Sequence, residues 1–191
     1  NAPIIQAAAN VAWALHQQGR QVGLCYTVPE ANSMGLALMG GGSLDEAFKS
    51  VENGKVKTLI ILENDLFRRA DKHRVNALFK KAEHIIVLDH IQTETTAQAE
   101  VVFPSSTFAE SDGTLVNNEG RAQRFYQVYV PAGEIRLSRL WLADIMASLE
   151  MEEASSFTTL DRTLDFLVNL LPQFRGCEKV TPRADFRVIG Q

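Results

Sequence analysis

Cysteine is scarce in this sequence. The 191 residues include 2 cysteines, Cys25 and Cys177, and neither belongs to a Cys-x-x-Cys pair. Zinc and iron–sulfur sites need several cysteine or histidine ligands at short, regular spacing. The sequence therefore predicts no metal site in this chain, and it predicts the reduced thiols that are usual in a cytoplasmic protein.

Long apolar runs and an excess of positive charge are also missing. No apolar run approaches the roughly 20 residues that a membrane-spanning helix needs, and no basic region followed by an apolar stretch begins the chain. The formal net charge is −4 and the sequence pI is about 5.6. A charge balance of this sign disfavours nucleic acid and anionic membranes as partners. We expect no nucleic-acid binding and no direct membrane insertion.

What is present is the composition of a folded globular protein, with 46% hydrophobic and 22% charged residues. The length suits one domain with a small appendage. We expect an α/β domain over residues 1–155, and a C-terminal helix with a loose tail over residues 156–191 that packs on it. The chain begins at Asn1 with an immediate helical pattern and no initiator Met, which predicts a fragment of a longer protein.

Helical and strand patterns alternate along the chain. The first helix is expected to end near Gly19 and to be followed by a strand over residues 21–27, then by a long loop through residues 28–42. The fully apolar runs that follow are typical of buried parallel strands. This alternation predicts an α/β, Rossmann-like fold with a mostly parallel sheet and helices on both faces. The apolar strands are expected over residues 56–62, 84–90 and 99–104.

Polar residues gather where these strands end, which is where open α/β sheets bind ligands. The run Gly40 to Gly42 is compatible with phosphate binding or with a flexible turn. Asp89 suits recognition of a purine base or ribose, or capping of the helix that begins near Thr93. His90 is compatible with a general base, but no nucleophile stands beside it, and an ordinary loop histidine is the favoured interpretation. We expect no catalytic residue.

The loop over residues 105–121, called here the signature loop, is the most specific part of the sequence. Glu110, Asn117 and Arg121, with Arg124 just beyond, have the chemistry to surround an anionic or polar ligand. A salt bridge between Glu110 and Arg121 that ties the loop together is the favoured alternative. Two turn pairs, 112–113 and 119–120, are expected to place their glycines at positive φ.

Residues 87–125 carry a family resemblance. They read as a strand followed by Asp, a Thr-Glu-Thr segment, a second strand ending in Pro, and Glu-x-x-Gly-Thr-x-x-Asn-x-Glu-Gly-Arg. This stretch resembles the molybdopterin oxidoreductase superfamily, of the formate dehydrogenase and nitrate reductase type, and the similarity extends over about residues 20–150. Within the superfamily it is most similar to the branch found in the large iron–sulfur subunit of bacterial respiratory complex I.

The resemblance implies a site for a pterin–guanine dinucleotide at the strand ends. Asp89 matches the acidic residue that recognises guanine in the family, and Glu110, Asn117 and Arg121 belong to the same motif. Ser111 and Ser138 stand where many members have a lysine and an acidic ligand. The resemblance therefore implies a vestigial cofactor site of Asp89, Glu110, Asn117 and Arg121 that no longer holds molybdopterin.

The resemblance also implies a function. It identifies a non-catalytic structural module of an NADH-quinone oxidoreductase, on the cytoplasmic side of the membrane. Its partners would be other subunits of the peripheral arm, and iron–sulfur clusters would lie in chain segments preceding it. Two alternatives stay open: the dinucleotide-binding domain of an active molybdopterin formate dehydrogenase or nitrate reductase, and a binding module whose strand-end loops dock another subunit.

Overall fold

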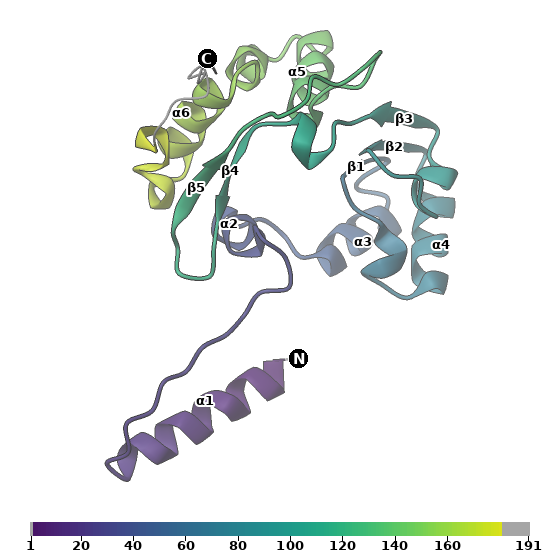
Figure 1. Cartoon of the computed structure of the whole chain (residues 1–191). Coiled ribbons are helices and arrows are strands. Elements are labelled where there is room, and N and C mark those ends of the chain that lie inside the picture. The colour runs from purple at the N-terminus through teal and green to yellow at the C-terminus, as the bar shows by residue number, and fades with distance from the viewer. Residues whose placement is uncertain (1, 181–191) are drawn as a thin grey trace.

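The protein is an α/β structure with one parallel and one antiparallel sheet. The computed structural model describes residues 2–180. Three parallel strands, β1 (Thr58–Leu62), β2 (His84–Asp89) and β3 (Val101–Pro104), form a sheet in that order. An antiparallel hairpin of β4 (Gly113–Val116) and β5 (Ala122–Phe125) extends from it (Figure 1). The α/β prediction is confirmed.

The core lies on one face of the parallel sheet, against α3 (Leu44–Glu52) and α4 (Lys72–Lys81). β1 leads through α4 to β2, which is the helical crossover that parallel strands require. Side chains alternate along a strand, so every second residue of β1 and β2 enters this core. The buried core residues are Phe48, Val51, Ile61, Leu66, Val75, Leu78, Phe79, Ile85 and Val87.

The opposite face of the sheet is covered only in part. Trp141 of α5 (Ser138–Ser148) packs on Phe103 with ring centroids 4.9 Å apart, and its indole N–H donates to Pro104 O. Ile60 and Leu62 of β1 remain 48% and 47% exposed. Helices thus cover one face well and the other over its β2–β3 side.

Two sequence predictions around residues 21–42 are wrong. Residues 21–27 are extended, but they form no strand in the described structure. Residues 33–39, expected to be loop, form α2 (Ser33–Met39). The side chain of Asn32 just before it accepts a hydrogen bond from Val116 N of β4 at 2.8 Å. This contact between residues distant in sequence positions the short helix, and no local pattern could reveal it.

The N-terminal helix α1 (Ala2–Gln17) lies apart from the two sheets, at the end of an extended linker (Figure 1). It has no buried residue, and Trp13 is 66% exposed. Gly19, at φ 74°, ends the helix as predicted. The sequence therefore predicted the helix correctly but not its packing.

The C-terminal part packs on the hairpin. α6 (Leu160–Leu170) ends before Pro172, which cannot continue a helix, and the turns after it pack back on α6. The expected loose tail falls partly on residues 181–191, which lie outside the described residues. Short 3-10 helices complete the structure: η1 (Leu66–Arg68), η2 (Thr96–Gln98), η3 (Phe108–Glu110), η4 (Glu152–Phe157), η5 (Pro172–Phe174) and η6 (Cys177–Lys179).

Candidate functional site

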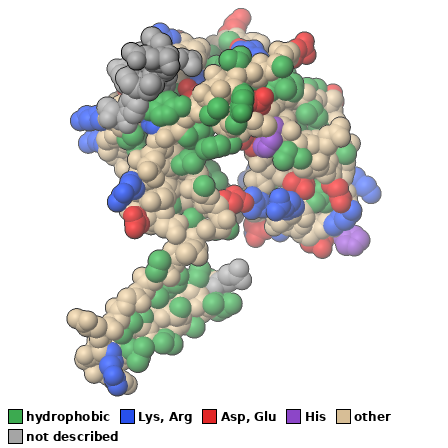
Figure 2. Space-filling view, viewed as in Figure 1, with side chains coloured by type: hydrophobic (Ala, Val, Ile, Leu, Met, Phe, Trp, Pro, Cys, Tyr) green, Lys and Arg blue, Asp and Glu red, His purple; other side chains and the backbone are tan. Residues whose placement is uncertain are grey.

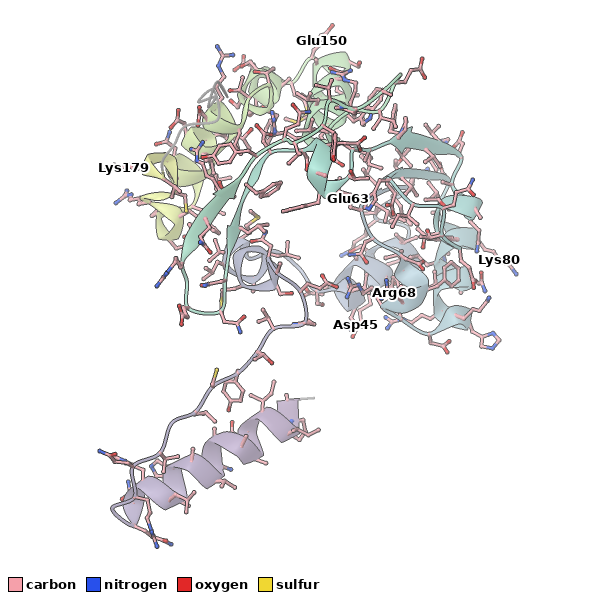
Figure 3. All side chains as sticks on the ribbon, viewed as in Figure 1. Asp45, Glu63, Arg68, Lys80, Glu150 and Lys179 are labelled. Atoms are coloured by element: carbon pink, nitrogen blue, oxygen red, sulfur yellow. The ribbon has the colours of Figure 1, made fainter. Side chains whose placement is uncertain are left out.

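The carboxyl end of the parallel sheet brings together three loops and the start of α5. Asp89 ends β2, Glu63 follows β1, and Ser105 follows β3. Ser138, the first residue of α5, donates its hydroxyl to Glu63 Oε1. Glu63 lies at the edge of the sheet that faces the hairpin (Figure 3). This edge is the candidate site.

Asp89 is buried, with 8% of its surface exposed, and its carboxylate shapes its own loop. Oδ1 accepts hydrogen bonds from His90 N at 2.7 Å and Ile91 N at 3.2 Å. The helix near Thr93 is capped by other groups, since Thr93 and Thr96 exchange backbone-to-hydroxyl bonds. The interpretation of Asp89 as the cap of that helix is therefore wrong, and its carboxylate instead fixes the turn directly after β2. His90 Nδ1 lies 3.5 Å from Asp89 Oδ1 and is a loop histidine.

Glu110 is held by a capping box within the signature loop. Its Oε2 accepts from both the backbone N–H and the hydroxyl of Thr107, each at 2.9 Å. These two bonds, the backbone one first, hold the pKa of Glu110 below its ordinary value. The predicted salt bridge between Glu110 and Arg121 is wrong, because a local hydrogen-bonding partner three residues away occupies the carboxylate.

Asn117 and Arg121 lie at the hairpin turn, away from the parallel sheet (Figure 1). Asn117 Oδ1 accepts from the backbone N–H groups of Glu119 and Arg121, both at 3.0 Å, so it fixes the turn. The Arg121 side chain is 70% exposed, and its Nη2 lies 3.8 Å from Glu119 Oε2. The four predicted cofactor residues thus divide between the sheet edge and the hairpin tip.

The two glycines of the signature loop have different roles. Gly120 has φ 76°, as a turn residue at positive φ should. Gly113 does not have a positive φ, so that prediction is wrong. A Cβ atom at Gly113 would come within 2.5 Å of the Phe125 ring, which stacks on Phe108 with centroids 4.3 Å apart. Gly113 is therefore needed for close approach across the hairpin.

Arg124 is the buried charge of the hairpin. Its side chain is 1% exposed, and Nη1 lies 2.8 Å from Asp161 Oδ1 of α6. Its Nε and Nη2, together with Thr114 Oγ1 directly across the hairpin, are buried without a hydrogen-bond partner in the described part of the chain. Sequence reasoning named Arg124 as a ligand candidate, whereas the structure uses it to join hairpin and helix.

The Thr-Glu-Thr segment is also structural. Thr95 is fully buried, and its hydroxyl donates to Asp65 Oδ1 at 2.7 Å and accepts from Leu66 N at 2.9 Å. It therefore ties the loop after β1 to the loop after β2. Nothing local in the sequence indicates that a threonine some thirty residues later holds the loop after β1.

The arginines around the sheet edge are each paired with a carboxylate. Arg69 pairs with Glu30, Arg136 with Asp144, and Arg139 with Asp112.

The Gly40–Gly42 turn has two glycines at positive φ, Gly40 at 73° and Gly41 at 100°, which favours the turn interpretation. Among residues 2–180, no group of three or more His, Cys, Asp or Glu side chains is arranged to hold a metal ion. The hydroxyl–carboxylate pairs at this edge, such as Ser138 with Glu63 and Thr95 with Asp65, connect separate segments of the chain.

Cys177, the partly buried one of the two cysteines, has its pKa raised, first by burial and then by the charge of Glu178. A raised pKa keeps the thiol protonated and poorly nucleophilic at neutral pH.

No helix within residues 2–180 is both long and apolar enough to cross a membrane.

Comparison with the sequences of known proteins finds relatives along almost the whole chain. The G subunit of NADH-quinone oxidoreductase from Salmonella typhimurium is 46% identical over 193 residues, covering 98% of this chain and 21% of the relative. Its counterpart in Escherichia coli K12 is 45% identical over 193 residues, with 98% and 21% covered. That of Pseudomonas fluorescens is 40% identical over 192 residues, with the same coverage.

The chain thus spans about a fifth of the length of these curated relatives. The sequence profile of the molybdopterin oxidoreductase family matches residues 1–139, which include all three strands of the parallel sheet and the hairpin. The chain belongs to the molybdopterin oxidoreductase family.

Proposed function

We propose that this chain serves as a non-catalytic structural module in the large iron–sulfur subunit of an NADH-quinone oxidoreductase. The relatives at 40–46% identity are the G subunit of that enzyme, and the match runs along nearly the whole chain. Electron transfer from NADH to quinone belongs, in this proposal, to iron–sulfur clusters in other parts of the subunit. The partners are other subunits of the peripheral arm, at the cytoplasmic face of the membrane.

The module binds no molybdopterin in this proposal. The observation that carries it is the use of the family's polar residues: Asp89, Glu110 and Asn117 accept hydrogen bonds from their own loops. A pyrophosphate group also needs unpaired cations or free N–H groups. At the sheet edge Arg69, Arg136 and Arg139 already pair with carboxylates. Asp89, Glu110 and Asn117 instead fix the backbone of their own loops.

The alternative is a dinucleotide-binding domain of an active formate dehydrogenase or nitrate reductase. One observation favours it: the Asp89 carboxylate keeps acceptor capacity beyond the two bonds that Oδ1 accepts. The buried Ser105 hydroxyl beside it also has no hydrogen-bond partner among the described residues. Neither group supplies positive charge for a phosphate, so we favour the structural module.

Elemental analysis of the full-length protein separates the two functions. The protein should be purified from cells that make molybdopterin, together with whatever subunits accompany it. We expect iron and no stoichiometric molybdenum, and co-purification with other subunits of an NADH-quinone oxidoreductase. One molybdenum atom per chain would contradict the structural module, and isolation of the chain without any partner subunit would contradict its place in a complex.

A further inference from the structure

Asn53 and Gly54 form the only Asn-Gly pair in the sequence. They follow α3 directly, and both residues are exposed. Figure 2 shows charged side chains of both signs over the part of the molecule that α3 and α4 form, which is a surface in contact with water. A glycine has no side chain to hinder approach to its backbone nitrogen. The pair therefore brings together a side-chain amide, an unhindered backbone nitrogen and solvent.

These groups can react with each other without a cofactor. The Gly54 nitrogen attacks the side-chain carbonyl carbon Cγ of Asn53 and forms a C–N bond. The side-chain nitrogen leaves as ammonia and takes the proton that the Gly54 nitrogen gives up. Water then opens the cyclic imide at either of its carbonyl carbons, which gives aspartate or isoaspartate. The net reaction consumes water and releases ammonia, and nothing is oxidised or reduced.

The folded structure holds the two reacting groups apart. Gly54 N donates to Val51 O at 2.9 Å, and Lys55 N donates to Ser50 O at 2.9 Å. Gly54 has a φ of 68°, the left-handed conformation of a glycine that ends a helix. With the ψ of Asn53 at 3°, the Gly54 N–H is turned back toward the helix and away from the Asn53 side chain. Attack therefore requires rotation of this peptide group, and the rotation breaks the hydrogen bond to Val51.

The end of α3 can open without disturbing the core. Residues 52–58 are all exposed, whereas Phe48 and Val51 are buried in the core. Exposed ends of elements open at a much lower free energy than the whole fold. Rotation at Asn53 therefore costs the last hydrogen bonds of the helix and leaves the packing of its apolar face in place.

We propose that Asn53 is a site of spontaneous deamidation, and that the hydrogen bonds at the end of α3 limit its rate to the time for which this end is open. The product changes the turn that leads into β1. Aspartate places a negative charge at a helix C-terminus, where the helix dipole disfavours it. Isoaspartate also lengthens the backbone, which displaces Lys55 N and Val56 N from Ser50 O. Deamidation therefore loosens the connection between α3 and the parallel sheet.

Peptide mass spectrometry of the full chain, incubated at mildly alkaline pH, measures the reaction. Deamidation raises the mass of the peptide that contains Asn53, and fragmentation distinguishes the two products. A second sample is incubated in urea, which removes the hydrogen bonds at the end of α3. We expect Asn53 to react in both samples and about tenfold more slowly in the folded one, which corresponds to an opening free energy of about 1.4 kcal/mol.

Asn53→Gln is the matched control. The variant keeps a side-chain amide, but the ring that its attack would close is larger and forms less readily, so this peptide should keep its mass. Asn118 is an internal comparison in the same sample, because it is exposed but is followed by Glu119, whose side chain hinders the attacking nitrogen. Asn118 should react more slowly than Asn53 in urea.

Three results would overturn the proposal. Equal rates at Asn53 in the folded and urea-denatured samples would show that the end of α3 gives no protection. Faster reaction at Asn118, or no reaction of Asn53 in urea, would show that Asn53 is not the reactive site. An unmodified Asn53 in the folded sample after the urea sample has reacted completely would show that the end of α3 does not open by itself.

Discussion

Arg124 shows how a single residue of a cofactor-family motif can become part of the packing. Its guanidinium is buried and reaches Asp161 of α6, while Arg121 three positions earlier is exposed at the hairpin turn. The two arginines look equivalent in the sequence, because both follow the Glu-Gly pair of the motif. Burial separates their roles, since a buried cation must have a partner and an exposed one need not.

Arg124→Ala should therefore lower the free energy of unfolding by about 3 kcal/mol, because it removes a buried guanidinium and breaks its ion pair with Asp161. Arg121→Ala is the matched control and should change it by less than about 0.5 kcal/mol, as exposed pairs contribute little. Urea denaturation of both variants measures the difference. Similar stability of the two variants would show that the hairpin does not depend on its ion pair with α6.

At the scale of the element, local sequence rules held well where both partners are close in the chain. Ser43 and Glu46 have the Ser-x-x-Glu spacing of a capping box, and they form one at the start of α3, with Ser43 N donating to Glu46 Oε2 at 2.6 Å. Thr107 and Glu110 form a second one that was not predicted. Its Thr-x-x-Glu spacing matches the Ser-x-x-Glu spacing of the first, so the local sequence carries the signal for both.

The capping box of α3 predicts a pH dependence. Hydrogen bonds from Ser43, the backbone one first, lower the pKa of Glu46 below the ordinary 4.5. A carboxyl group with a lowered folded-state pKa stabilises the fold above its unfolded pKa, and this contribution is lost as the pH falls through the folded-state value. Glu46→Gln keeps the hydrogen-bonding shape without the titrating group.

The free energy of unfolding of the unchanged protein should therefore fall more steeply below pH 4.5 than that of Glu46→Gln. Urea denaturation between neutral and acid pH measures both slopes. Glu110→Gln serves as a second variant, because the pKa of Glu110 is lowered in the same direction by Thr107. Parallel slopes for all three proteins would contradict the assignment.

At the scale of the whole molecule, two parts meet at the carboxyl end of the parallel sheet. Ser138 at the start of α5 donates to Glu63 after β1, and Glu63 has a φ of 45°, unusual for a residue with a side chain. A backbone in that conformation needs support from its surroundings. The contact therefore holds the sheet and the hairpin-bearing part in one arrangement.

Ser138→Ala should reduce the free energy of unfolding by about 1.5 kcal/mol, because it removes a hydrogen bond to a carboxylate at a buried position. Ser148→Ala is a control in the same helix, where an exposed hydroxyl bonds Asp144 O. Hydrogen exchange should quicken at the start of α5 and at residues 63–65 in the first variant alone. An unchanged exchange rate at both places would mean that the two parts are held together elsewhere.

The sequence by itself determined the α/β class, the three parallel strands, most helices and the family, because apolar periodicity, caps and turn residues act over a few neighbouring positions. The tertiary structure decided what those residues do. Asn32 positions α2 through β4, Thr95 ties two loops, and Arg124 binds α6, and each depends on partners about thirty or more residues away. A strand pattern such as residues 21–27 likewise specifies what could pair, whereas pairing itself needs an edge that only the folded sheet provides.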